Sequence, residues 1–226
     1  MNIYELIGLI IGDGYIAYNK KKRYYFLEIT GDVLDDTEFF EKISHFLYNL
    51  TGKKPIISLR KRETGQFLQM HLNYKSFVEY LINKLDLPFG KKTFLIKIPE
   101  KFNTWKELKD ILRGIFEADG SLYFSKSKKN KYPTYPRIEF RTSSQALAFQ
   151  ILNILKKQDF NMNIMKTKYK DYKIYLSGEI MLEKWVKEIG FSNLATITKY
   201  DLWKKLGFYI PKITFEERKK LLKAIN

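Results

Sequence analysis

The alternation of apolar and polar residues predicts the same series of elements in both halves of the chain. In the first half, helical periods and helix end signals predict helices, and alternating or β-branched runs predict strands. The predicted elements are a helix at Tyr4–Gly12, strands at Tyr15–Ala17 and Tyr24–Thr30, a helix at 37–50, strands at Pro55–Arg62 and Gln66–Leu72, and a helix at 75–85. The order is therefore helix, two strands, helix, two strands, helix.

The second half repeats this order and adds a final segment. A capping-box pattern at Thr104–Glu107 opens its first helix. The predicted elements are a helix ending at Asp119, strands at Leu122–Ser125 and Arg137–Arg141, a helix at 144–157, strands at Met162–Tyr169 and Tyr172–Leu176, a helix at Ile180–Ile189, and helical segments at Tyr200–Leu206 and Thr214–Ala224. We expect an α+β fold of two tandem αββαββα repeats related by a pseudo-two-fold axis. The expected organisation is an N-terminal half at 1–97, a linker at 98–103 and a C-terminal half at 104–226.

Both halves begin with the same type of apolar stretch, Leu6–Gly14 (LIGLIIGDG) and Leu112–Gly120 (LRGIFEADG). Small residues lie four positions apart in each copy and so share one helix face. A glycine inside a helix costs roughly 1 kcal/mol relative to alanine, so a compensating contact is needed. We therefore expect the two copies to pack closely against each other. A single Asp-Gly turn is common, but two copies half a chain apart favour a functional pair.

Each copy ends in Asp-Gly, at Asp13 and Asp119. We expect the following glycines, Gly14 and Gly120, to adopt the left-handed conformation that ends a helix. The two carboxylates would then stand side by side at helix C-termini, where the helix dipole disfavours negative charge. Such a pair predicts a divalent-metal site, and its hard oxygen ligands suit Mg²⁺.

Charge and composition indicate a polyanionic partner. The 226-residue chain has 41 Lys and Arg against 25 Asp and Glu, a net charge of +16. We expect nucleic acid and not a membrane, because the apolar run before Asp13 is far shorter than the ~20 residues a membrane span needs. The absence of cysteine excludes disulfides and cysteine-based zinc sites. Neither His45 nor His71 is expected to be a metal ligand, since no HExxH pattern is present.

The duplicated motif and the repeated order of elements resemble the LAGLIDADG family of homing endonucleases. The resemblance covers essentially the whole chain and is nearest to the monomeric type with two motifs that is encoded within archaeal introns. It implies that the motif helices form the interface between the halves and that two antiparallel sheets form a DNA-binding saddle. It also implies a staggered double-strand break in a long, non-palindromic double-stranded DNA target.

The resemblance assigns roles to particular residues. Asp13 and Asp119 would bind Mg²⁺, or Mn²⁺, with help from the main-chain carbonyls of Gly12 and Ala118. A basic residue from each half would lie near the scissile phosphates. From their loop positions, Gly90–Thr93 and Ile197–Tyr200, these are Lys92 (or Lys91) and Lys199. Polar residues at the ends of the second strands would hold water near the metals, at Thr30, Gly31 and Asp32 in the first half and at Thr142 and Ser143 in the second.

The chain departs from the family pattern at three points. The sixth motif position, often acidic in the family, is Ile11 in the first copy and Glu117 in the second, where we assign the glutamate a supporting role. Gly31 has no side chain to hold water, so Asp32 is the expected substitute. The splicing residues of an intein are absent from the two ends, so the sequence resembles a free endonuclease.

Basic and amide side chains on the predicted strands are candidates for DNA recognition. Those expected to contact base edges are Arg60, Arg62, Gln66, Gln69, Arg137, Arg141, Lys166, Lys168 and Lys173. Those in turns are expected to contact the DNA backbone, chiefly phosphates, and are Lys20–Lys22, Arg23, Lys126, Lys128, Lys129 and Lys131.

Three alternatives to the endonuclease stay open. One is an intron RNA maturase of the same fold, and another is a DNA-binding regulator that does not cut. A third is a structural protein that uses the small-residue helices for dimerisation, against which the net charge argues. A cytoplasmic, prokaryotic and thermophilic archaeal setting is the expected one, with an organellar origin left open.

Overall fold

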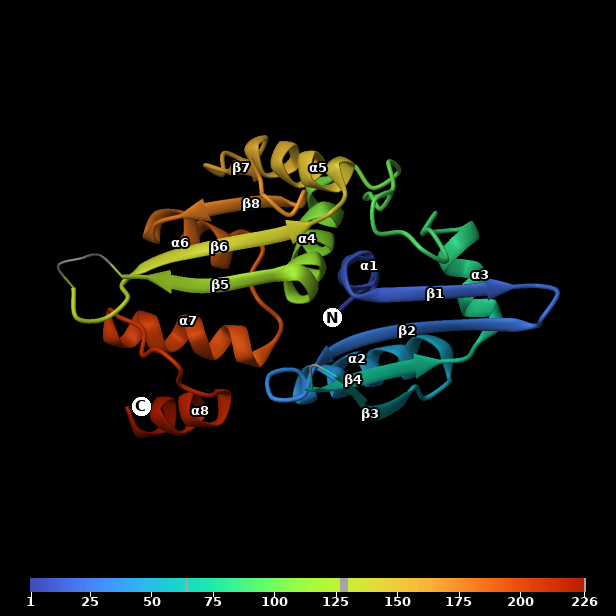
Figure 1. The fold of residues 1–226 in the computed structure, drawn as a ribbon, viewed down its shortest axis with the longest axis horizontal. Helices are drawn as coiled ribbons and strands as arrows, with labels where there is room; N and C mark the ends of the chain where they lie inside the picture. Colours follow the sequence, from blue (N-terminus) through green and yellow to red (C-terminus); the bar gives the residue numbers. More distant parts are fainter. Residues whose placement is uncertain (64, 127–129, 226) are drawn as a thin grey trace.

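A computed structural model describes residues 1–63, 65–126 and 130–225 (Figure 1). Its first half contains helix α1 (Ile3–Gly12), strands β1 (Gly14–Asn19) and β2 (Tyr24–Asp32), helix α2 (Thr37–Thr51), strands β3 (Ile56–Arg62) and β4 (Gly65–Leu72), and helix α3 (Lys75–Asn83). Its second half contains helix α4 (Trp105–Asp119), strands β5 (Gly120–Ser125) and β6 (Tyr135–Thr142), helix α5 (Gln145–Lys156), strands β7 (Asn163–Lys166) and β8 (Tyr172–Ser177), and helices α6 (Glu179–Glu188), α7 (Leu194–Leu206) and α8 (Phe215–Ala224).

The two halves have the same topology. Each contains a four-stranded antiparallel sheet, in the order β1-β2-β4-β3 and β5-β6-β8-β7. The sheets lie on either side of the adjacent helices α1 and α4 (Figure 1). The predicted α+β fold with two tandem repeats is therefore confirmed, while the boundaries at 97/98 and 103/104 stay predictions.

The contact between α1 and α4 depends on small residues. A Cβ added to Gly8 would lie 2.1 Å from the carbonyl oxygen of Ile111, and one added to Gly114 would lie 2.0 Å from that of Glu5. Because the obstacles are backbone atoms, the helices could accept a larger residue only by separating. The expectation that the two motif copies pack together is confirmed.

The prediction for Gly14 and Gly120 is wrong. Neither has a positive φ, and Gly120 is extended, with φ −95° and ψ 167°. Each glycine is instead the first residue of a strand that leaves the helix end at once. A Cβ there would lie 2.5 Å from Cα of Ile10, or 2.3 Å from a ring carbon of Phe116. Glycine is therefore required at these two positions because neighbouring atoms leave no space for a side chain, and not because the backbone is left-handed.

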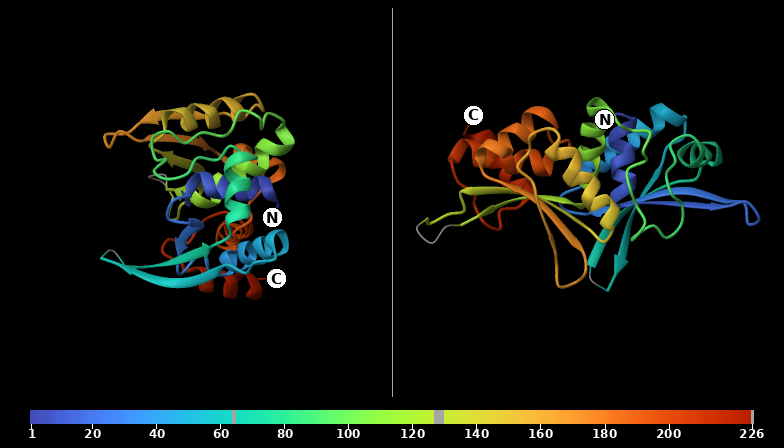
Figure 2. Two further views of the ribbon diagram at one scale, coloured as in Figure 1. Left: turned by 90° about the vertical axis from the view of Figure 1, so that its right-hand side faces the viewer. Right: turned by 90° about the horizontal axis from the view of Figure 1, so that it is seen from above.

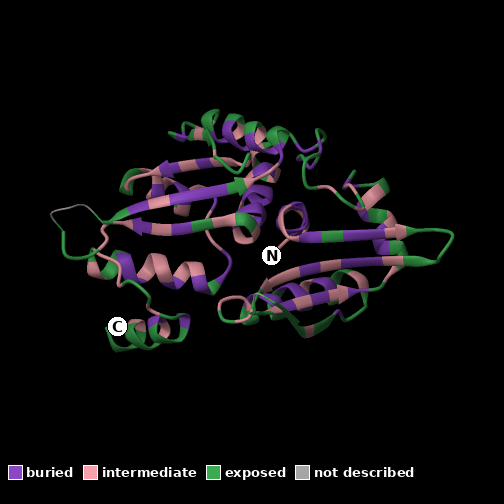
Figure 3. Cartoon of the chain, viewed as in Figure 1, coloured by how far each residue is buried: buried purple, intermediate pink, exposed green. Residues whose placement is uncertain are grey.

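The helices gather on one side of both sheets, while hairpins β3–β4 and β7–β8 extend from the other side (Figure 2). Alternate residues of β6 and β8, such as Ile138, Ile174 and Leu176, are buried against the helices (Figure 3). Glu139, on the other face of β6, is also buried. We call the side of each sheet that faces away from the helices its open face. Its residues are available to a partner without disturbing the core.

Two predicted boundaries in the second half are wrong. Strand β7 ends at Lys166, because Thr167 begins a turn in which its amide donates to the carbonyl of Asp171 at 2.8 Å. Helix α7 begins at Leu194 and includes Ile197–Tyr200, which we expected to be a loop. Asn193 caps this helix by accepting a hydrogen bond from the amide of Ala195.

Substitution of Gly114 by alanine tests the helix contact. Alanine should gain roughly 1 kcal/mol in helix propensity. Overpacking against the Glu5 carbonyl should nevertheless lower the free energy of unfolding by roughly 2 kcal/mol or more in urea titrations. Lys106→Ala, at an exposed position of the same helix, is the control and should change stability little. A Gly114→Ala protein as stable as the wild type would contradict the close contact.

Candidate functional site

The two motif aspartates come together at the ends of the paired helices. Asp13 is the C-cap of α1, where its amide donates to the carbonyl of Leu9 at 3.0 Å, and Asp119 is the last residue of α4. A Cβ added to Gly12 would lie 2.4 Å from Cβ of Ala118 and 3.2 Å from Oδ2 of Asp119, so the missing side chain lets the two helix ends approach each other. The expected acidic pair is therefore present.

Burial strongly affects both carboxylates. Burial, the charge of Asp119 and the charge of Asp36 raise the pKa of Asp13 to about 7, although Lys92 acts in the opposite direction. Burial raises the pKa of Asp119 to about 6. Two acids that share a poorly hydrated space repel each other when both are charged. The site is therefore one that a cation would stabilise.

Lys92 lies beside this pair. Its ammonium donates to the carbonyl oxygens of Ile10 and Ile11, the latter at 3.0 Å, at the C-terminal end of α1. Burial lowers the pKa of Lys92 to about 8, and the charges of Asp119 and Asp13 oppose that decrease. Lys91 is exposed, so of these two neighbours it is Lys92 that faces the acids.

A cavity of about 270 Å³ lies next to Asp119. Gly12 and Lys92 line it from the first half, and Thr142 and Ser143 line it from the end of β6. This half of the site therefore has the predicted composition of an acid, a lysine and hydroxyl groups. Arg141 and Asp171 also line the cavity. We missed Asp171 because its sequence signal is only that of a turn.

The corresponding region of the first half is built differently. Oδ1 of Asp32 accepts hydrogen bonds from the amides of Leu34 and Asp35 at 2.7 and 3.1 Å, so this carboxylate holds its own loop together. Among the acids of this loop, the one whose charge raises the pKa of Asp13 is Asp36. A Cβ on Gly31 would lie 2.5 Å from a ring carbon of Phe40 and 2.9 Å from Oδ2 of Asp36, so the glycine makes room for both side chains.

Asp36 is a residue that the sequence analysis missed as part of the site. It directly precedes α2, but its side chain makes no capping hydrogen bond. Oδ2 instead accepts from the amide of Asp32 at 2.7 Å, and Oδ1 accepts from the side-chain amide of Asn193 at 2.6 Å. Burial raises the pKa of Asp36. The cluster of three aspartates within residues 32–36 was the available signal.

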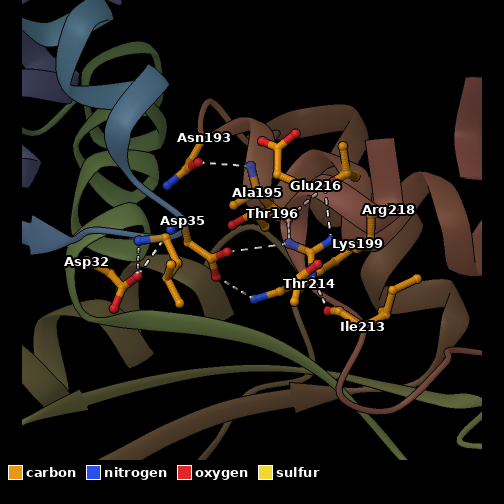
Figure 4. A network of polar contacts seen from close by, with 12 residues as sticks. Asp32, Asp35, Asn193, Ala195, Thr196, Lys199, Ile213, Thr214, Glu216 and Arg218 are labelled. Carbon is orange, nitrogen blue, oxygen red and sulfur yellow. Dashed lines mark hydrogen bonds and ion pairs between the residues drawn. The ribbon is translucent and has the colours of Figure 1, made fainter. Parts of the chain in front are cut away.

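Lys199 does not mirror Lys92. It lies within α7, and its ammonium pairs with Asp35 at 3.8 Å (Figure 4). Glu117 lies on the same side of the site, where its carboxylate accepts from the amide of Ser192 at 2.5 Å, and burial raises its pKa to about 7. Glu117 thus fastens the segment before α7 to α4. Its supporting role at a metal stays a prediction.

Strand register separates the candidate DNA-binding residues into two groups. Directly paired residues of antiparallel strands have side chains on the same face. The candidates on the open faces are Arg60, Arg62, Gln69, Arg137, Arg141 and Lys173. Gln66 pairs with Lys61, and Lys166 pairs with Tyr172, both on the opposite face. Lys168 lies outside the strands, in the connection between β7 and β8.

The open-face arginines are held by neighbouring side chains. Nε of Arg60 donates to Gln69 at 2.8 Å, and the Arg62 guanidinium lies 4.0 Å from the ring centre of Phe67. On the second sheet, Lys173 and Arg141 bind Glu139, which sequence analysis had missed. Burial would raise the pKa of Glu139, but these two contacts hold it below its ordinary value.

Several of the remaining candidates lie in turns. Arg23, in the turn between β1 and β2, and Lys126, after β5, are exposed. Lys128 and Lys129 lie outside the described residues.

The two histidines lie away from the acidic pair in the chain. His45 is on α2 beside Asn49, and His71 is on β4 near Glu28. Within the described ranges, no helix is long and apolar enough to cross a membrane.

Two family models match the chain. The one described as a LAGLIDADG-like domain matches residues 107–200, and the one described as a WhiA LAGLIDADG-like domain matches residues 4–71. Among characterised proteins, the Replication factor C small subunit of Thermococcus kodakarensis is 25% identical over 203 residues. The match covers 84% of this chain but 19% of that protein, so this chain spans about a fifth of the length of that relative.

Solved structures share the fold. A variant of the homing endonuclease I-DmoI has a TM-score of 0.58 at 20% identity, covering 84% of this chain and 95% of that chain. I-DmoI in complex with DNA and Mn has a TM-score of 0.57 at 20% identity, covering 84% and 96%. I-WcaI bound to its DNA recognition sequence has a TM-score of 0.57 at 18% identity, covering 92% and 86%.

Together the two family models span most of the chain, one on each half, and the solved structures share its two-sheet architecture. The chain therefore belongs to the LAGLIDADG family, with two LAGLIDADG-like domains in one polypeptide.

Proposed function

We propose that this protein is a site-specific DNA endonuclease that makes a staggered, metal-dependent double-strand break in a long, non-palindromic target and acts as a monomer. The observation that carries the proposal is the pair of Asp13 and Asp119, whose pKa values are both raised, with the Lys92 ammonium beside it, at the junction of two sheets. Fold neighbours that hold DNA support it, one of them together with Mn.

The donor groups fit a hard divalent cation. Carboxylates of Asp13 and Asp119, with the carbonyls of Gly12 and Ala118, offer oxygen ligands of the kind Mg²⁺ and Mn²⁺ prefer. Among the described residues, no three acidic or histidine side chains gather to form a metal site. Mg²⁺ is commonly bound by one or two carboxylates and completed by substrate phosphates. A metal shared between protein and DNA suits this arrangement.

The chain's own residues supply the remaining chemistry. A bound metal would activate a water and stabilise the leaving oxygen. Lys92 would place its positive charge next to the phosphate on which negative charge develops. The hydroxyls of Thr142 and Ser143, which line the cavity at Asp119, would hold water there. A second centre in the other half, built from different residues, would allow both strands to be cut.

DNA would lie across the open faces of the two sheets. The net charge of +16 favours a polyanion, and the arginines on these faces present donors that suit guanine edges in the major groove. Because the two halves differ in sequence, the target need not be palindromic.

A second candidate function is DNA binding without cleavage. The observation that favours it is the match of residues 4–71 to the WhiA LAGLIDADG-like domain. The presence of both acids together with Lys92 favours the endonuclease. A third alternative, the intron RNA maturase, gains no support from the fold or the comparisons.

Replacement of either motif acid tests the nuclease directly. The protein is incubated with a random DNA library and Mg²⁺, and the ends produced are sequenced. Wild-type protein should give discrete staggered ends that EDTA abolishes. Asp13→Asn and Asp119→Asn should each lower the cleavage rate at that site roughly 100-fold or more, the scale of losing one electrostatic stabiliser, while DNA binding remains. The exposed control Asp159→Asn should cut normally. Binding without any cut by wild-type protein would favour the non-cleaving alternative.

The acidic pair should also limit the stability of the metal-free protein. A carboxyl whose pKa rises on folding binds its proton more tightly in the native state, so stability falls as pH rises from about 4 to about 7. In EDTA, the Tm of the wild type should decrease between pH 5 and pH 8 by more than that of Asp13→Asn. At pH 8 the variant should be more stable by about 1 kcal/mol, or about 2–4 °C. Mg²⁺ should raise the Tm of the wild type only. If the Tm of the wild type and of Asp13→Asn depended on pH in the same way, the folded structure would not raise the pKa of Asp13.

Adjacent residues of β3 offer a matched test of the DNA-binding face. Arg60 and Lys61 are both basic and exposed, but they lie on opposite faces of the sheet. On the target, Arg60→Ala should weaken DNA binding by about 1–3 kcal/mol and relax base preference at one position. Lys61→Ala should change neither, as measured by fluorescence anisotropy at fixed salt. Equal effects of the two changes would rule out the assigned face.

A further inference from the structure

Asp35 joins the two halves at a point close to the site. It lies in the loop between β2 and α2, whereas its two cationic partners come from the C-terminal helices (Figure 4). Its Oδ2 lies 3.8 Å from the ammonium of Lys199 on α7, and its Oδ1 lies 3.7 Å from NH2 of Arg218 on α8. One carboxylate thus lies between two positive charges.

Arg218 is fixed in place. Its side chain is 2% exposed, and its donors bind the hydroxyl of Thr198 at 3.1 Å and the carbonyls of Ile213 at 2.9 Å and Ala195 at 3.2 Å. The guanidinium cannot turn toward solvent without breaking these bonds. Lys199 is therefore held next to a permanent positive charge.

Lys199 depends on a nearby anion to remain an ammonium ion there. Burial lowers the pKa of Lys199, the charge of Asp35 is the strongest opposing influence, and Arg218 lowers it further. Asp36 and Glu117 act more weakly in the same direction as Asp35. Loss of the Asp35 charge would leave Lys199 beside an uncompensated guanidinium. Its ammonium would then lose its proton or move away.

The contact is accessible enough to be exchanged. The side chains of Lys199 and Asp35 are 29% and 38% exposed. A phosphate oxygen arriving at this side of the site can therefore replace the carboxylate. Lys92 differs, because its opposing charges are Asp119 and Asp13 themselves. The two lysines thus occupy unequal environments although they follow the two acids at similar distances in the sequence.

We propose that Asp35 is a positioning residue that holds the Lys199 ammonium ready for the phosphate of one DNA strand, so that it controls the cutting of that strand and not of the other. The inference rests on the proposed endonuclease function. Under this proposal, the other DNA strand is cut at the centre that contains Lys92.

Strand-specific kinetics test this assignment. A duplex with the target site carries a different fluorophore on each strand, and single-turnover cleavage with excess protein and Mg²⁺ is followed on denaturing gels. Asp35→Asn should slow one strand at least tenfold and leave the other within about twofold, so that nicked duplex accumulates. Lys199→Met should slow the same strand. Asp35→Glu, which keeps the charge, should restore most of the rate.

Glu38→Gln is the matched control. Glu38 also joins the first half to α8, through an ion pair with Lys219 at 2.7 Å, but it does not face Lys199. It should leave both strand rates unchanged, and thermal unfolding should show that all variants are folded at the assay temperature. Equal slowing of both strands by Asp35→Asn, or no slowing, would overturn the positioning role while leaving the nuclease intact. A wild-type protein that cuts neither strand would overturn both.

Discussion

The close approach of α1 and α4 is the constraint on which the rest of the molecule depends. With glycine at positions 8 and 114, the backbone of each helix occupies space that a side chain would otherwise fill. This contact brings two helix C-termini, and with them Asp13 and Asp119, to one point. It also fixes the position of both sheets, because β1 and β5 begin at the residue after each acid. Packing and site geometry are therefore one property of the fold.

Electrostatics at this point work against the folded protein. Two partly desolvated carboxylates lie near each other at the ends of helices that disfavour anions, and the Lys92 ammonium beside them partly offsets their charge. Natural proteins retain such unfavourable groups where they bind or react. The Lys92 ammonium also loses hydration there. A bound ligand could therefore stabilise both the carboxylates and the ammonium.

Sequence analysis predicted the fold well because the information was local and duplicated. Two motif copies, capping signals and alternating strands determined the order of elements, and the contact through small residues followed from their spacing. The features that it missed depend on tertiary contacts. Nothing near Gly14 or Gly120 in the sequence shows that Ile10 and Phe116 occupy the space beside them. Likewise, Asp36 acquires its place through Asn193, more than 150 residues away. For Gln66 the two-residue period of a strand was available but was not applied. The register pairs it with Lys61, on the face of the sheet that Arg60 does not share.

The alternation of burial along the strands has an evolutionary consequence. Every second residue of a strand such as β6 or β8 belongs to the core, and the residues between them belong to the open face. Substitutions on the open face leave the packing almost untouched, so they can accumulate by drift without unfolding the protein. The two sheets can also diverge independently, because the main contact between the halves is the one between the motif helices. Under the proposed function, a chain of this design could acquire new recognition sequences one position at a time while its central site stays the same.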